Sequence, residues 1–202
     1  MRVVTFDIET QGAFSGPLPD LSQLKVALVG VHDSESGNYS SYLEHELGAL
    51  WPLFERADVL VGYNSDHFDI PILNKYYPGD LTQIKSIDLL KEIKNVLGRR
   101  LKLDNLAEAT LGKKKSGSGL EAARWWEQGL VEKVREYCLD DVRLTRALYD
   151  HAREHGFLKY KDFSAPGGSA SGGDSVRDIK LDTSLWETLS TNAPALTHTL
   201  PF

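Results

Sequence analysis

The sequence predicts an α/β fold, in which helices pack on a mixed β-sheet made of an antiparallel three-strand meander and added parallel strands. Three β-rich segments follow one another within residues 1–43, and consecutive short strands joined by turns favour a meander. Strand and helix patterns alternate over residues 44–89, which favours strands added in parallel. The chain has 202 residues, 41% of them hydrophobic, so it can bury one full core.

The meander is expected to open the chain. An apolar, β-rich run predicts the first strand at residues 3–10, and the segment 12–19 is expected to be a loop. Residues 24–33 are almost continuously apolar, which is typical of a buried strand. A turn at residues 34–38 then leads into a short strand at residues 39–43.

The next segment is expected to alternate between helices and strands. Helical spacing of apolar residues predicts a helix at residues 44–57 and another at residues 68–77, where Pro71 is tolerated in the first turn. Apolar runs predict a strand at residues 59–63 and a strand leading into a helix at residues 84–89.

The following segment is expected to be mainly helical. Apolar residues at helical intervals predict a helix at residues 101–112, which Gly112 ends. Residues 113–119 contain three lysines followed by Ser and Gly, so we expect a mobile basic loop. A short helix is expected at residues 120–128, and the longest helix at residues 131–154.

The globular domain is expected to span residues 1–163. Residues 164–175 are dominated by Gly, Ser and Ala and cannot offset their ordering entropy by burial, which predicts a flexible linker. Residues 176–202 are too few for their own core. The apolar groups of this tail leave three alternatives: a disordered end, a segment that orders on a protein partner, or a tail folded back on its own domain. We expect residues 164–202 to be dispensable for activity.

Composition excludes several classes of protein. The sequence has no apolar run near the roughly 18 residues of a membrane span, and it begins with a strand pattern instead of a signal region. A cytoplasmic protein without membrane contact is therefore expected. Cys138 is the one cysteine, which excludes an internal disulfide and a thiolate zinc cluster.

Charge is unevenly distributed along the chain. The net charge is −6, yet residues 85–115 hold nine Lys or Arg against four Asp or Glu. A basic segment on an acidic chain suits a phosphate-bearing ligand. A solvated charged surface is an equally good interpretation of the same pattern.

Two acids at the end of the first strand are the first candidate site residues. Successive side chains of a strand alternate between faces, so Asp7 and Glu9 are expected side by side. Like charges this close repel, and a bound cation is the usual compensation in an apolar setting. Two solvated acids at a strand end are the alternative.

Further candidate acids lie on expected helices. Asp141 falls on an apolar helical stripe with Tyr137 one turn earlier. A carboxylate on a buried face needs a partner, so the pair predicts either a metal ligand or a structural Tyr–Asp hydrogen bond. Asp69 lies in the first turn of an expected helix. Capping is the alternative interpretation for Asp69 and Asp66, and an ordinary helix-starting role is expected for Asp88.

The candidate residues form three short motifs in chain order: Asp7-x-Glu9, Asn64-x-x-x-Phe68-Asp69 and Tyr137-x-x-x-Asp141. In order and spacing they resemble the three motifs of the DEDD superfamily of 3′-5′ exonucleases, in its tyrosine variant. The wording Phe-Asp-Ile-Glu-Thr is most similar to the proofreading exonuclease domain of family-B DNA polymerases. The resemblance covers residues 1–155 and implies a ribonuclease H-like fold, which agrees with the mixed sheet predicted above.

The resemblance also implies a mechanism with two metal ions. Mg²⁺ or Mn²⁺ would suit the site, because these cations prefer oxygen ligands. Two ions would be held around the scissile phosphate by four carboxylates: Asp7, Glu9, Asp69 and Asp141. Tyr137 would orient the attacking water.

The implied substrate is the 3′ end of a single-stranded nucleic acid, with DNA favoured over RNA. Thr10, Asn64 and Phe68 would contact the terminal nucleotide, and the dense basic run Lys113-Lys114-Lys115 is expected to contact the backbone. RNA as the natural substrate is one alternative, and a non-catalytic nucleic-acid-binding domain is another. The chain is too short to include polymerase domains, so we expect it to act alone or to dock on a protein partner.

Overall fold

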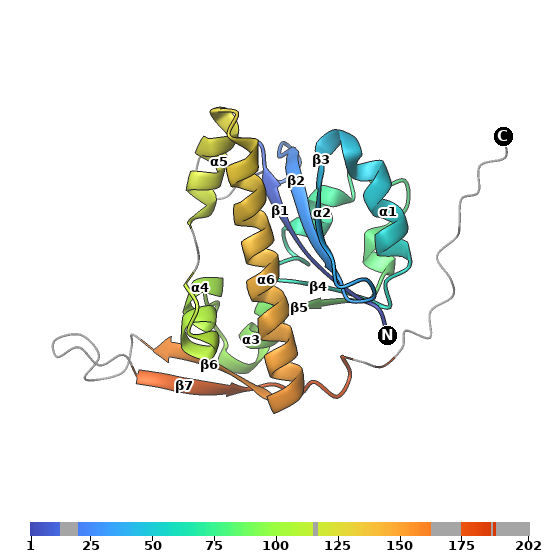
Figure 1. The fold of residues 1–202 in the computed structure, drawn as a ribbon. Coiled ribbons are helices and arrows are strands. Elements are labelled where there is room, and N and C mark those ends of the chain that lie inside the picture. Colours follow the sequence, from blue (N-terminus) through green and yellow to red (C-terminus); the bar gives the residue numbers. More distant parts are fainter. Residues whose placement is uncertain (13–19, 115–116, 163–174, 187, 189–202) are drawn as a thin grey trace.

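The main sheet of the protein has five strands: β1 (Val3–Thr10), β2 (Val26–Asp33), β3 (Tyr39–Leu43), β4 (Val59–Gly62) and β5 (Ser86–Asp88). Their order is β3-β2-β1-β4-β5 (Figure 1). β1 and β3 pair antiparallel with β2, whereas the β1–β4 and β4–β5 pairs are parallel. The predicted meander with added parallel strands is therefore confirmed.

The fold comes from a computed structural model that describes residues 1–12, 20–114, 117–162, 175–186 and 188. Its helices are α1 (Leu47–Glu55), α2 (Asp69–Leu73), α3 (Leu89–Leu97), α4 (Leu103–Leu106), α5 (Gly119–Glu127) and α6 (Val131–His155). Three short helical segments accompany them: η1 (Glu44–Glu46), η2 (Leu81–Gln83) and the π-helical η3 (Ala107–Leu111). Among the helices described, none is long and apolar enough to cross a membrane.

Alternation along β1 divides the core between the two faces of the sheet. Phe6 and Ile8 pack with α1 and α2 on one face, and Val3 packs with α3, α4 and α6 on the other. Figure 1 shows α6 running across the sheet with α1 beyond the opposite side. Asp7 and Glu9 have the opposite parity to Phe6 and Ile8, so both carboxylates point to the side of α6.

The C-terminal segment forms two strands that the sequence pattern does not predict. β6 (Phe157–Asp162) and β7 (Ser175–Lys180) pair antiparallel in a separate two-stranded sheet. Beyond β7, Trp186 is buried and its ring stacks on Tyr149 of α6, with 5.4 Å between ring centroids. The apolar groups of this segment therefore complete the core of the main domain.

Lys85 attaches the last described residues to the domain. Its Nζ donates hydrogen bonds to the carbonyl oxygens of Leu185, Trp186 and Thr188, at 2.8, 3.1 and 2.5 Å. Three carbonyl acceptors around one ammonium group satisfy its three donors. The lysine thus holds the tail next to the start of β5.

These contacts correct the expected domain boundary at residue 163. Residues 175–186 fold back on the domain instead of forming a detached tail, because β6 offers a strand to pair with and α6 offers an aromatic surface. The expected linker at residues 164–175 lies outside the described residues except for Ser175. Residues 189–202 of the expected tail also lie outside them.

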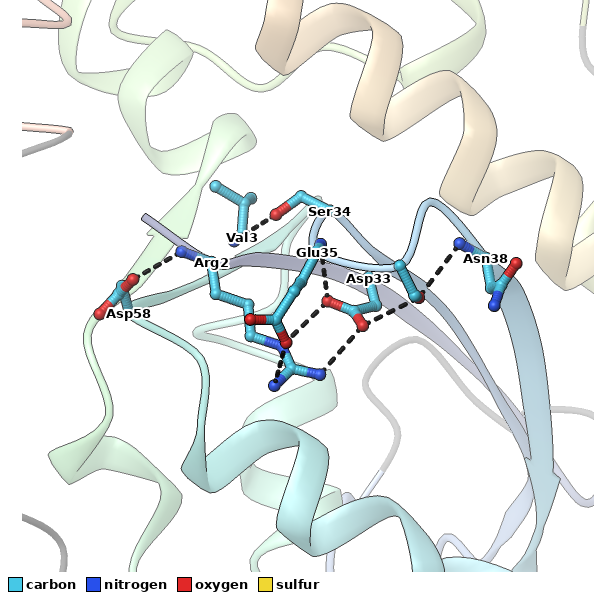
Figure 2. Close-up of polar contacts among 8 residues, drawn as sticks. Arg2, Val3, Asp33, Ser34, Glu35, Asn38 and Asp58 are labelled. Atoms are coloured by element: carbon cyan, nitrogen blue, oxygen red, sulfur yellow. Dashed lines mark hydrogen bonds and ion pairs between the residues drawn. The ribbon is translucent and has the colours of Figure 1, made fainter.

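The N-terminus is fixed by a partly buried ion pair that Figure 2 shows. The Arg2 guanidinium donates to both carboxylate oxygens of Asp33, at 3.0 and 2.9 Å, and its third nitrogen lies 2.9 Å from Glu35. Burial raises the pKa of Asp33, but hydrogen bonds from Arg2, the Glu35 amide and Ser36 outweigh it and lower the pKa to about 2. The ion pair joins the start of β1 to the end of β2.

The Arg2–Asp33 pair predicts a pH-dependent part of the stability. The pKa of Asp33 is below its ordinary 3.8, so the stabilisation is present above pH 4 and is lost as the pH falls from 3.8 to about 2. We expect Asp33→Asn to lower the free energy of unfolding by about 2 kcal/mol at pH 7, with the difference narrowing below pH 4. Urea unfolding from pH 2 to 7 measures it, with Glu35→Gln as the exposed control. A difference that stays constant down to pH 2 would contradict the assignment.

The Trp186 contact predicts that the tail contributes to stability. Removing a buried tryptophan ring leaves a cavity, so Trp186→Ala should lower the free energy of unfolding by about 3 kcal/mol. Leu185→Ala is the matched control, because the neighbouring Leu185 side chain is 70% exposed and its loss should cost less than about 0.5 kcal/mol. Equal denaturation midpoints for the two variants would show that the tail is not part of the core.

Candidate active site

A cavity of about 250 Å³ lies at the carboxyl end of β1, where side chains from β1, the β4–α2 loop, α5 and α6 meet. Every predicted metal ligand lines it, and so do Tyr137 and the three predicted contacts to a terminal nucleotide. These residues are Asp7, Glu9, Thr10, Asn64, Phe68, Asp69, Tyr137 and Asp141. The structure therefore brings together residues that lie up to 134 positions apart in the sequence.

β1 supplies two carboxylates on one face. Asp7 and Glu9 are half-buried, while Phe6, Ile8 and Thr10 between and beside them are buried. This is the alternation that the strand period requires. One carboxylate oxygen of Asp7, one of Glu9 and the Sγ atom of Cys138 lie within 4.8 Å of one another.

α6 lies close to the sheet at a glycine of β2. Gly30 is the register partner of Asp7, and a Cβ atom at Gly30 would be 2.9 Å from Cys138 Sγ and 3.2 Å from a methyl group of Val142. Real side chains do not approach this closely, so position 30 tolerates only glycine without a shift of α6. The missing side chain lets α6 press its buried face directly against β1 and β2.

Cys138 is a site residue that the sequence reasoning missed. Its Sγ lies 3.4 Å from the carbonyl oxygen of Asp7 and 3.5 Å from Asp7 Oδ2, both within reach of the thiol proton. Burial raises the pKa of the thiol, and the charges of Asp7, Glu9 and Asp141 raise it further. The thiol therefore keeps its proton and can donate it to Asp7. Its position directly after Tyr137, on the same buried stripe of the helix, is the sequence feature that could have identified it.

α6 also supplies Tyr137 and Asp141, both of which are buried. Burial is the main cause that raises the pKa of the Tyr137 phenol, followed by the negative charges of Asp141, Glu9 and Asp7. The phenol consequently keeps its proton and can donate a hydrogen bond. Its ring packs edge-on against Trp125 of α5, with 6.1 Å between ring centroids.

The β4–α2 loop delivers the fourth acid. Asp69 is buried, and its Oδ1 accepts a hydrogen bond from the Ile8 amide at 3.1 Å, which ties α2 to β1. Burial raises the pKa of Asp69, and this hydrogen bond lowers it in part. The loop folds tightly over β4. A Cβ atom at Gly62 would lie only 2.5 Å from Ser65 Oγ, so the loop needs glycine at this position.

The capping alternatives have different outcomes. Asp88 is the N-cap of α3, where its carboxylate accepts from the amides of Leu90 and Lys91, as expected. Asp69 lies in the first turn of α2, and its carboxylate also accepts from the Ile8 amide of β1. Asp66 instead accepts from Ser86 Oγ and pairs with Lys91.

Two of the predicted basic contacts line a different cavity. Lys113 and Lys114 line a cavity of about 270 Å³ together with Asp140 and Arg143 of α6. Lys115 lies outside the described residues. Another basic side chain contacts a residue of the acid cavity, since Arg100 Nη2 donates to the Asn64 side-chain oxygen at 2.6 Å.

The donor set fits a divalent cation. Carboxylate oxygens are the ligands that hard divalent cations prefer. The cavity lining contains four carboxylates and, among the residues described, no histidine. Oxygen donors therefore predominate over the single nearby sulfur, that of Cys138, which favours a hard cation.

Gly30 gives a prediction that separates site geometry from folding. Gly30→Ala should move α6 outward by a few tenths of an ångström, which displaces Tyr137 and Asp141 relative to Asp7. A misplacement of this kind can lower a catalytic rate by up to about a hundredfold, while overpacking costs about 1–3 kcal/mol. The measurement pairs the rate of the hydrolysis that the sequence predicts with thermal unfolding, and Gly48→Ala is the control because nothing lies within 4 Å of a Cβ at Gly48. Unchanged turnover in Gly30→Ala would show that the contact does not set the geometry.

Comparisons with known proteins identify the fold and the family. A family profile of the RNase H superfamily matches residues 4–153. No curated protein matches the sequence. Among solved structures, the family B DNA polymerase from the hyperthermophilic archaeon Pyrobaculum calidifontis is similar, with a TM-score of 0.59 and 23% identity over 75% of this chain. The match covers 24% of the polymerase chain, so this protein corresponds to about a quarter of its length.

Proposed function

The chain belongs to the RNase H superfamily, and from this premise we propose that it is a metal-dependent 3′-5′ exonuclease. It would hydrolyse phosphodiester bonds at the 3′ ends of single-stranded nucleic acid, with DNA favoured over RNA. One observation carries the proposal: four carboxylates and a protonated phenol from three separate segments converge in one cavity. The similarity to a family B DNA polymerase agrees with it at the level of the fold.

The four carboxylates would hold two Mg²⁺ or Mn²⁺ ions. When bound, such ions supply an activated water and neutralise charge on the scissile phosphate and the leaving oxygen. Asp7, Glu9 and Asp141 would bind the ion next to the attacking water. Asp69 would support the second ion together with Asp7. Cys138 would orient the Asp7 carboxylate through its thiol proton.

Tyr137 would position the attacking water. Its phenol keeps its proton because burial and three nearby carboxylates raise its pKa. A protonated phenol can donate to the water or to a phosphate oxygen and leaves the water lone pair directed at phosphorus. The edge-on packing against Trp125 keeps the ring in one orientation.

The residues around the acids would recognise the strand. Asn64 and Thr10 offer polar contacts to the terminal nucleotide, and Phe68 offers a ring on which a base can stack, at about 1–3 kcal/mol per base. Lys113 and Lys114, which share a second cavity with Arg143, would contact backbone phosphates. None of these proposed contacts distinguishes a ribose 2′-hydroxyl from its absence in DNA, so RNA is retained as a second candidate substrate.

The proposal is tested with end-labelled oligonucleotides. A 5′-labelled single strand should give a ladder that shortens step by step, and a 3′-labelled strand should release its label at once. DNA and RNA strands are compared with Mg²⁺, with Mn²⁺ and with chelator. No product with any metal, together with tight binding of the strand, would favour the non-catalytic binding domain.

The acid cavity predicts which substitutions abolish hydrolysis. Asp7→Ala and Asp141→Ala should each lower turnover by more than a thousandfold, since each removes a ligand shared by the proposed metal site. Both variants should fold, and without metal they should be at least as stable as wild type because like-charge repulsion is relieved. Glu136→Ala is the matched control, since this acid directly precedes Tyr137 on α6 but its side chain is exposed. Turnover within tenfold of wild type in either ligand variant would refute the assignment.

The role of Tyr137 predicts an intermediate effect. Tyr137→Phe keeps the ring and removes the one donor, so turnover should fall about a hundredfold, less than after loss of a metal ligand. The melting temperature should stay close to that of wild type because the contact with Trp125 is retained. Single-turnover rates measure the effect on the chemical step. A complete loss equal to that in Asp141→Ala would show that the hydroxyl has another role.

A further inference from the structure

Asp88 connects the candidate active site to the neighbouring strand and helix. It is the last residue of β5, its side chain is buried, and it does not line the acid cavity. A buried carboxylate needs several hydrogen-bond donors to offset its desolvation. The origin of those donors indicates what Asp88 does.

The Asp88 carboxylate accepts hydrogen bonds from four backbone amides that belong to two different segments. Its Oδ1 accepts from Leu90 at 2.9 Å and from Lys91 at 3.3 Å, which caps α3. The same oxygen accepts from the Asn64 amide at 2.7 Å, and Oδ2 accepts from the Asp66 amide at 3.2 Å. Only the first two contacts are needed for a helix cap. The other two hold the β4–α2 loop.

The loop has a conformation that requires such support. Asn64 has a φ of 68°, and it is the one residue other than glycine with positive φ among those the structure describes. This region costs a non-glycine residue free energy, and it persists only where the surroundings enforce it. The 2.7 Å bond from Asp88 to the Asn64 amide is the shortest of the four and acts at the strained residue.

The strained residue determines where two further cavity residues lie. The carbonyl oxygen of Asn64 accepts hydrogen bonds from the amides of His67 and Phe68, at 3.2 and 3.0 Å. This turn leads directly into Asp69, the first residue of α2. A change in the backbone at Asn64 would therefore move the Phe68 ring and the Asp69 carboxylate.

A second set of contacts fastens the loop to the same support. The Asp66 carboxylate accepts from Ser86 Oγ and from Lys91 Nζ, both at 2.6 Å. Ser86 belongs to β5 and Lys91 to α3, the two elements that Asp88 joins. The loop is thus attached to the β5–α3 junction through both its backbone and a side chain.

We propose that Asp88 is a positioning residue for the exonuclease site: by binding the Asn64 and Asp66 amides it holds the loop that directs Asn64, Phe68 and Asp69 into the cavity. The inference rests on the proposed function for its effect on turnover. The two roles of Asp88, capping and loop support, can be separated by side-chain length.

Asp88→Ser is the decisive variant. Serine is as good an N-cap as aspartate, so α3 keeps its cap, but the shorter side chain cannot also reach the Asn64 and Asp66 amides. The catalytic efficiency kcat/KM on a single-stranded oligonucleotide should fall about 10- to 100-fold. Asp88→Asn keeps the side-chain length and the acceptor toward Asn64, and should restore kcat/KM to within about fivefold of wild type.

Asp80→Ser is the matched control. Asp80 is also an N-cap aspartate, whose carboxylate accepts from the Thr82 amide at the start of η2, but it is exposed and lies outside the cavity. Its kcat/KM should stay within twofold of wild type. All assays are run well below the melting temperature of each variant.

A double variant tests whether Asp88 acts through Asn64. Glycine adopts positive φ without strain, so Asn64→Gly should make the loop less dependent on Asp88. Adding Asp88→Ser to Asn64→Gly should therefore lower kcat/KM by less than threefold. A merely structural role would give the full additional loss, because effects at independent sites add. Full additivity would overturn the proposal.

A measurement without turnover separates this proposal from the proposed function. In amide NMR spectra of the whole chain, the Asn64 and Asp66 protons should shift and exchange faster with solvent in Asp88→Ser than in wild type. Unchanged signals would overturn the positioning role even if the wild type proved to have no nuclease activity. Wild-type hydrolysis with unchanged turnover in Asp88→Ser would overturn the positioning role alone. If the wild-type protein hydrolyses the oligonucleotide no faster than the Asp7→Ala variant does, the exonuclease assignment alone is refuted.

Discussion

The close approach of α6 to β2 over Gly30 is the contact on which the site depends. Gly30 pairs in register with Asp7, and the Cys138 thiol occupies the space that a side chain at position 30 would fill. Because α6 is fixed at this point, the buried residues on either side of Cys138 are fixed as well. Tyr137 and Asp141, one turn apart on the same stripe, then lie opposite the carboxylates of β1. The absence of a side chain at Gly30 therefore sets how closely the α6 carboxylate can approach the two carboxylates of β1.

Four carboxylates in one cavity repel one another when ionised, and several contacts limit that cost. Asp7 and Glu9 keep partial contact with water, the Ile8 amide donates to Asp69, and the Cys138 thiol donates to Asp7. Burial still raises the pKa of Asp69. Repulsion of this kind is typical of functional sites, where stability is given up for chemistry. A bound divalent cation is the group that relieves it most directly.

Much of the site could be predicted because it depends on local periodicity. A period of two places Asp7 and Glu9 on one face of a strand, and a period of 3.6 places Tyr137 and Asp141 on one face of a helix. β6 and β7 could not be predicted in this way. β6 alternates buried and half-buried residues over one short segment, and its second edge is completed by Asn105 and Thr110 side chains, which bind the backbone of Lys161 and Lys159. The choice of such partners depends on tertiary structure, which a short alternation in the sequence does not report.

The tail and the active-site loop, which look unrelated in the sequence, are supported by the same strand. Lys85 directly precedes β5 and binds the carbonyl groups of the tail, while Asp88 ends β5 and binds the amides of the loop. β5 is an edge strand with a single neighbour, β4, so it has little support within the sheet itself. The ammonium at one end and the helix cap at the other hold this short strand in place. The folded-back tail and the loop are therefore attached to opposite ends of the same three-residue strand.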